Sequence, residues 1–134
     1  MLFRSLEMLS RDDFRPRQMI DAEVEWDDLN MRLIGEVESL APFGPANPEP
    51  TLLLRQVVLG GLRIVGTNHL KFLVGKPGNA SGGMIDVIGF RMGERLAGLR
   101  DGAKVDLVFT PERNVWQGRE RIQLRLKDLR PSEI

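Results

Sequence analysis

Residues 93–100, GERLAGLR, form a short helical stretch in the middle of a run of strand patterns. Leu96 and Leu99 are its apolar points, so we expect a short helix with one face against a core. Three strand patterns precede it and two follow it. Five strands with one short helix between the third and the fourth is the order of an OB-fold, a small Greek-key barrel. The sequence predicts this barrel within a mainly β chain, with an SH3-like barrel as the alternative.

The expected strands span residues 51–65, 69–74, 84–91, 104–110 and 122–129. Residues 51–59 form an apolar, β-branched run that bends at Gly60-Gly61, whereas residues 69–74 alternate cleanly between apolar and polar side chains. Alternation decides which side chains face the core. Three phenylalanines are assigned to that core: Phe72, Phe90 and Phe109. Three side chains of the last strand are expected to face outward: Gln123, Arg125 and Lys127. Gly118 marks the tip of a hairpin between the last two strands.

Residues 40–50, LAPFGPANPEP, separate the barrel from an acidic connector. Four prolines in this stretch exclude a helix or a central strand. Residues 1–50 hold five arginines and eleven carboxylates, a net charge of −6, and residues 51–134 hold fourteen basic and eight acidic residues, a net charge of +6. We therefore predict a connector over residues 1–50 and an OB-fold domain over residues 51–134. The charge asymmetry points to an anionic partner for the basic part. We expect the acidic part to compete with that partner for the same basic groove.

The connector carries two apolar patterns. Residues 20–26 alternate as a strand with one buried face. Residues 29–40 are expected to form a helix capped by Asp27-Asp28, with an apolar stripe of Leu33, Ile34, Val37 and Leu40. Residues 1–14 have apolar residues at helical spacing, which predicts a further helical segment.

Several classes of function are excluded by composition. Without cysteine there is no disulfide framework, no thiolate metal site and no cysteine nucleophile. No apolar run approaches the ~20 residues that span a bilayer, and the N-terminus lacks a secretory cleavage pattern, so we expect a cytoplasmic protein without membrane contact. His69, the one histidine, makes neither a metal site nor a catalytic triad by itself. No metal ligands and no catalytic residues are predicted in this chain.

Basic residues on the outer strand faces indicate a nucleic-acid interface. A positive groove with a few stacking aromatic side chains is how OB-folds hold single strands. Trp116, at the hairpin tip, is the candidate stacking platform, although packing over the barrel end is its alternative role. The predicted DNA-binding residues are His69, Lys71, Arg91, Arg113, Trp116, Arg119, Arg121, Arg125 and Lys127.

Five segments resemble the RecJ family of single-strand-specific DNA exonucleases. Residues 40–50 resemble the PFGxGNPxP linker of that family, and residues 66–71, GTNHLK, match its G..HLK strand. Residues 114–118, NVWQG, match its Asn-x-aromatic-x-Gly hairpin, and residues 122–130 match its closing strand. Upstream, residues 15–16 and 20–23 resemble the segment that joins the DHHA1 domain of the family to its OB-fold.

The resemblance implies a C-terminal portion of a 5′–3′ single-stranded-DNA exonuclease that acts in DNA repair and recombination. The family holds two manganese or magnesium ions in an N-terminal DHH domain, which has no counterpart here, so this chain alone is expected to be inactive and to bind no metal. Single-stranded DNA, the missing catalytic domains and a single-strand-binding or other repair protein are the implied partners. Two alternatives stay open: an OB module that binds an acidic peptide, and a structural brace for the catalytic domains.

Overall fold

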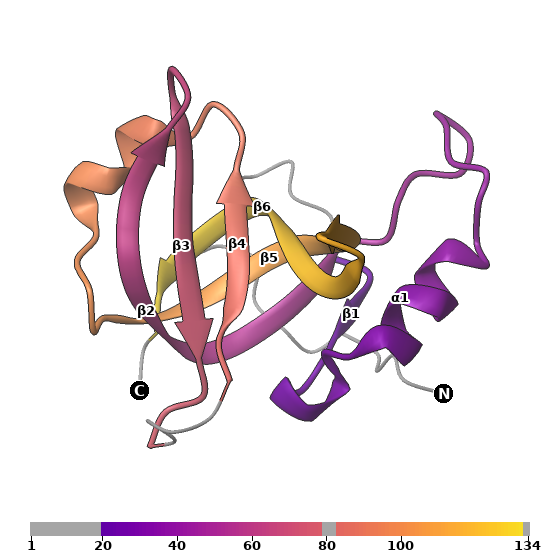
Figure 1. The fold of residues 1–134 in the computed structure, drawn as a ribbon, viewed down its shortest axis with the longest axis horizontal. Coiled ribbons are helices and arrows are strands. Elements are labelled where there is room, and N and C mark those ends of the chain that lie inside the picture. Colours follow the sequence, from indigo (N-terminus) through magenta and orange to yellow (C-terminus); the bar gives the residue numbers. More distant parts are fainter. Residues whose placement is uncertain (1–19, 79–82, 133–134) are drawn as a thin grey trace.

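A computed structural model describes residues 20–78 and 83–132, in which five strands close a barrel (Figure 1). The order around the barrel is β2–β3–β4–β6–β5, closed by pairing of β2 with β5. Only β4 and β6 pair in parallel within it. The barrel strands are β2 (Leu52–Val65), β3 (His69–Gly75), β4 (Ile85–Gly89), β5 (Lys104–Trp116) and β6 (Arg119–Pro131). A 3-10 helix, η2 (Gly93–Gly98), lies between the third and fourth barrel strands, so the predicted OB-type barrel is confirmed.

The connector forms a short strand, a turn and a helix: β1 (Ala22–Glu23), η1 (Trp26–Asp28) and α1 (Met31–Glu38). β1 extends the sheet in parallel to β2. The helix is shorter than the predicted residues 29–40. Asn30, and not Asp27-Asp28, is its N-cap, because the Asn30 side chain accepts the Leu33 N–H at 3.2 Å. Leu40 lies beyond its end and is 47% exposed. The helical pattern predicted over residues 1–14 lies outside the described residues.

One hydrophobic core joins the connector to the barrel. Phe72 and Phe109 are fully buried, as predicted. Leu33 and Val37 of α1 belong to the same buried cluster, together with Ala22 of β1. The division of the chain at residue 50 stays a prediction, and the core extends across it.

The connector also covers part of the outside of the barrel. Ile20 packs against Leu53 of β2 and Val108 of β5 in a second buried cluster. Thr110 of β5 is fully buried and donates its hydroxyl hydrogen to the Pro50 carbonyl oxygen at 2.9 Å. The outer side of β2 and β5 is therefore covered around Leu53, Val108 and Thr110 by residues from before Thr51. The outward-facing side chains of β3 and β4 remain partly exposed.

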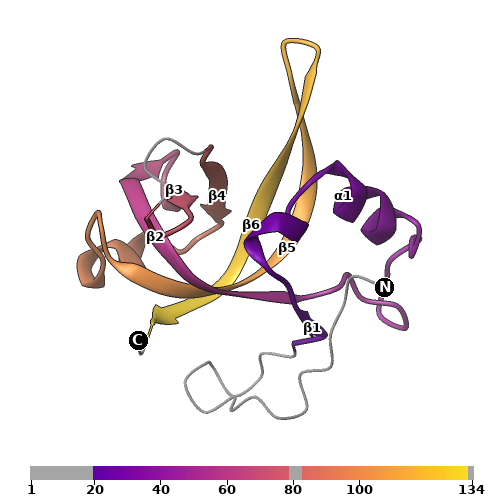
Figure 2. The same cartoon turned by 90° about the horizontal axis from the view of Figure 1, so that it is seen from below.

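The hairpin of β5 and β6 is longer than predicted and projects beyond the barrel (Figure 2). Its pairing runs from Val105 with Pro131 to Trp116 with Arg119. The sequence predicted shorter strands because alternation of buried residues stops at the barrel rim, whereas backbone pairing continues past it. In the described part of the chain, no helix is long and apolar enough to cross a membrane.

Candidate nucleic-acid interface

The outer faces of β3, β4 and β6 form one continuous open surface. Leu70, Phe72 and Val74 point inward, so their neighbours on β3 point out. The register places Lys71 opposite Ile88, and Ile88 opposite Arg125, in one row across the three strands. We call this surface the open face; its outward residues are His69, Lys71, Leu73, Asp86, Ile88, Gln123, Arg125 and Lys127.

The projecting hairpin extends the open face. Trp116 pairs with Arg119, and Asn114 pairs with Arg121, on the same face as Arg125. Trp116 is 57% exposed, so it is not part of the core. Gln117 and Gly118 have φ of 49° and 76°, the conformation of a two-residue type I′ turn. This turn holds the tryptophan ring at the tip of the hairpin.

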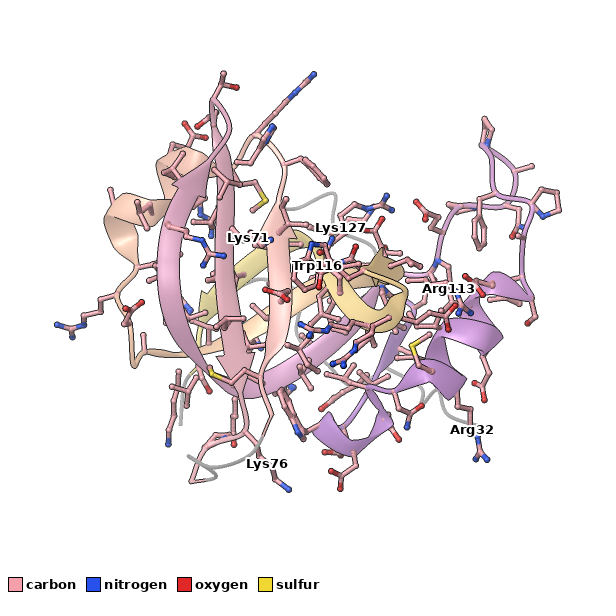
Figure 3. All side chains as sticks on the ribbon, in the orientation of Figure 1. Arg32, Lys71, Lys76, Arg113, Trp116 and Lys127 are labelled. Atoms are coloured by element: carbon pink, nitrogen blue, oxygen red, sulfur yellow. The ribbon has the colours of Figure 1, made fainter. Side chains whose placement is uncertain are left out.

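Arg113 lies on the opposite face of the hairpin, which α1 covers (Figure 3). Its Nε and Nη2 donate to the two carboxylate oxygens of Glu38 at 3.0 and 2.8 Å, and its Nη1 lies 2.7 Å from Glu120. The hydrogen bonds from Arg113 lower the pKa of Glu38, and Glu38 raises the pKa of Arg113. Because the folded-state pKa of Glu38 is lowered, the pair stabilises the fold above the ordinary carboxyl pKa, and this contribution is lost as pH falls through the lowered value. Solvent screening keeps it small.

Arg125 is on the open face but is already paired. It makes ion pairs with Glu49 of the proline-rich stretch and, at 3.2 Å, with Glu112 of β5. Within residues 20–78 and 83–132, no ion pair holds the remaining open-face cations, which are Lys71, Arg119, Arg121 and Lys127. Four cations of the open face are therefore available to an anionic ligand.

His69, Phe90 and Arg91 gather at the end of the open face next to η2. The Arg91 N–H donates to His69 Nδ1 at 3.1 Å. Phe90 is 51% exposed, so its assignment to the core was wrong. Val87 and Gly89 face inward, so the alternate positions face outward. Phe90 is an even number of residues from the charged Asp86 and therefore shares its outward side. The spacing from Asp86 was the signal in the sequence that Phe90 faces outward.

The structure thus separates the nine predicted residues into two groups. Eight of them lie on the open face or on its extension along the hairpin and the turn after β4, with Trp116 at one end and His69 and Arg91 at the other. Arg113 is separated from them by the thickness of the hairpin. Among the described residues, no group of three or more His, Cys, Asp or Glu side chains could hold a metal ion.

The barrel and its open, cationic face place this protein in the class of OB-fold domains. The RecJ OB domain family model matches residues 20–128. The chain is 32% identical over 127 residues to the single-stranded-DNA-specific exonuclease RecJ of Bacillus subtilis, covering 93% of this chain and 16% of that protein. Two structures of Thermus thermophilus RecJ, with Mn²⁺ and with Mg²⁺, are similar at a TM-score of 0.55 each. They are 26% and 25% identical over 78% of this chain, which matches 14% and 15% of theirs.

This chain belongs to the RecJ OB domain family. The resemblance found in the sequence is therefore confirmed. The chain spans about a sixth of the length of the Bacillus subtilis relative, 16%.

Proposed function

We propose that this chain is the single-stranded-DNA-binding domain of a RecJ-like 5′–3′ exonuclease that acts in cytoplasmic DNA repair and recombination. The Bacillus subtilis relative is a single-stranded-DNA-specific exonuclease, which supports this substrate class. In this proposal the catalytic centre, with its manganese or magnesium ions, belongs to the other domains of the longer protein. The OB domain grips the strand on its way to that centre.

The observation that carries the proposal is the asymmetry of the barrel's outer surface. The side formed by β2 and β5 is covered by the connector around Leu53, Val108 and Thr110. The uncovered side bears the exposed Trp116 and four cations that make no ion pair with any described residue. Lysine and arginine bind the phosphates of a strand, and an exposed indole offers a flat face to a base. Among the described residues, three carboxylates lie on this side, Asp86 together with Glu49 and Glu112 beside Arg125. Arg125 and the four cations without an ion pair outnumber them, so the net charge of the open face is positive.

Salt dependence of binding tests this proposal. We expect the purified chain to bind fluorescein-labelled oligothymidylate weakly. The slope of log K against log salt should be about −3, because each of four phosphate contacts contributes about −0.7. Fluorescence anisotropy at 50–300 mM salt measures it. Binding that is absent, or independent of salt, contradicts the proposal.

An acidic peptide is the second candidate ligand, and one observation favours it: Arg125 already binds the carboxylates of Glu49 and Glu112. The same surface could therefore bind an acidic segment of a repair protein. Competition separates the two ligands. If DNA is the ligand, an oligoglutamate peptide displaces the labelled oligonucleotide only at high excess; displacement at equal concentration favours the peptide.

The absence of nuclease activity is a further expectation of this proposal. A labelled single strand incubated with this chain and Mn²⁺ should stay intact, because two-metal hydrolysis requires ligands that the described residues do not bring together. Gel electrophoresis of the strand measures it. Degradation that copurifies with the chain contradicts the assignment of catalysis to other domains.

A further inference from the structure

Two aromatic rings lie at the end of the open face opposite Trp116: Phe90, which is exposed, and His69, which is half-buried. The rings of His69 and Phe90 are in contact, with centroids 5.3 Å apart and planes at 75°. Phe90 is 51% exposed, close to the 57% of Trp116. An aromatic side chain this exposed gains little from the core, and its ring is accessible to a ligand outside the barrel.

Backbone contacts hold this pair in place. The Arg91 N–H bonds to His69 Nδ1, and the Gly93 N–H bonds to the Asn68 carbonyl oxygen at 3.1 Å. These bonds tie the turn before β3 to the turn after β4. Gly66 leaves room for the imidazole, since a Cβ at that position would lie 3.0 Å from His69 Cδ2. The imidazole and the backbone next to Phe90 are therefore held in place before any ligand arrives, which reduces the entropy lost on binding.

The hydrogen bond also fixes how the imidazole is presented. Because Nδ1 accepts a hydrogen bond, it carries no proton, and the ring proton of the neutral form is on Nε2. His69 can therefore donate from Nε2 to a base or a phosphate while the Phe90 ring stacks.

We propose that Phe90, supported by His69, is a second stacking platform for single-stranded DNA. One base stacks on Phe90, and a base further along the same DNA strand stacks on Trp116. This inference rests on the proposed function. The strand would follow the open face between the two platforms, past Lys71 and Lys127. Aromatic platforms at both ends of a cationic groove hold a strand without reading its sequence.

The register gives the length of this path. Ile88 lies opposite Arg125, so Phe90 and Lys127 are each two residues further along their parallel strands. From Lys127 to Arg119, the partner of Trp116, the path along β6 covers eight residue steps. At about 3.3 Å per residue this is roughly 26 Å. Stacked nucleotides about 3.4 Å apart need about eight to span it, and a more extended strand needs fewer.

Oligonucleotides of two lengths test the inference. With Phe90→Leu, which keeps an apolar side chain but removes the ring, we expect affinity for a twelve-nucleotide oligothymidylate to fall roughly 5- to 150-fold, the equivalent of ~1–3 kcal/mol for one stacked base. Phe90→Trp should retain it. A four-nucleotide oligothymidylate reaches one platform only, so its affinity should fall less. Leu40→Ala is the matched control, because Leu40 is 47% exposed but lies in the proline-rich stretch.

A direct contact is the second measurement, and it does not depend on how the variants fold. Photocrosslinking of the unaltered chain to an oligonucleotide with 5-iodouracil at each position should label Phe90 from one end and Trp116 from the other. The inference is overturned if the chain binds DNA but crosslinks only at Trp116, or if folded Phe90→Leu binds both lengths as the unaltered chain does. In that case the exposed Phe90 ring would contact another domain of the longer protein and not DNA. If the unaltered chain fails to bind DNA at all, the proposed function itself fails.

Discussion

At the scale of single residues, the position of Trp116 separates binding from folding. Its ring is 57% exposed, so truncation removes little buried area. We expect Trp116→Ala to reduce oligonucleotide affinity by ~1–3 kcal/mol, because one stacking contact is lost, while Tm changes little. Anisotropy and thermal unfolding measure the two effects.

Val115→Ala is the matched control for this prediction. Val115 is 59% exposed but lies on the other face of the hairpin, where it pairs with Glu120. It should leave affinity unchanged. A Trp116→Ala chain that melts much lower but binds normally when folded would make Trp116 a structural residue.

Two glycines with free space around them should respond in opposite directions. A Cβ at Gly118 or at Gly35 would meet nothing within 4 Å. Gly118 has φ +76°, so Gly118→Ala should cost about 1–2 kcal/mol of stability through backbone strain alone. Gly35 lies inside α1, where alanine is favoured, so Gly35→Ala should gain about 0.5–1 kcal/mol. Urea unfolding measures both; equal shifts would show that the turn tolerates a side chain.

At the scale of elements, the connector neutralises two arginines on opposite faces of one hairpin. Glu49 pairs with Arg125 on the open face, whereas Glu38 pairs with Arg113 on the face toward α1. Glu49→Gln frees a cation next to the strand's path, so we expect oligonucleotide affinity to rise roughly two- to tenfold. Glu112 still holds Arg125 and limits the gain.

Glu38→Gln is the control for this substitution, because it removes the same charge but frees an arginine that faces away from the strand. Its affinity should stay within about twofold of the unaltered chain, apart from the general effect of one lost negative charge. Titration of both variants at the same salt concentration distinguishes them. Equal gains would mean that net charge, and not the face, controls binding; a loss with Glu49→Gln would mean that Glu49 positions Arg125 for DNA.

At the scale of the whole molecule, connector and barrel should unfold together. Leu33 of α1 is fully buried in the core that contains Phe72 and Phe109. Leu33→Ala should therefore destabilise the entire fold by about 2–5 kcal/mol, in a single unfolding transition. Arg32→Ala, on the exposed side of the same helix, should leave Tm nearly unchanged. Calorimetry measures both; two separate transitions, with the barrel unshifted, would contradict a shared core.

This shared core changes how the acidic connector can be tested. A chain shortened to begin near Pro50 loses Leu33 and Val37 together with the carboxylates. A change in the DNA affinity of this shortened chain would reflect both its lower stability and its lost negative charge. Single charge-neutralising substitutions separate the two effects.

The sequence by itself determined the barrel. Strand alternation is a local property, so it identified the inward faces of β3 and β6 correctly, and the helix between the third and fourth strands selected the OB order. Gly118 marked the hairpin turn for the same reason, since a turn of two residues depends only on its own backbone. Matches of short motifs then identified the family, which the comparisons confirm.

Only the tertiary structure decided which outer faces stay open. Alternation says which side chains share a face, but the cover over that face comes from residues remote in sequence, as Ile20 covers Val108. For this reason the basic residues looked equivalent in the sequence, although Arg113 faces α1 and Arg125 faces outward beside Glu49. Phe90 was placed in the core because hydrophobicity alone favours burial, whereas strand parity and the turn after β4 expose it. Whether a side chain is buried depends on what packs against it in the folded chain, so the sequence of a single strand does not determine it.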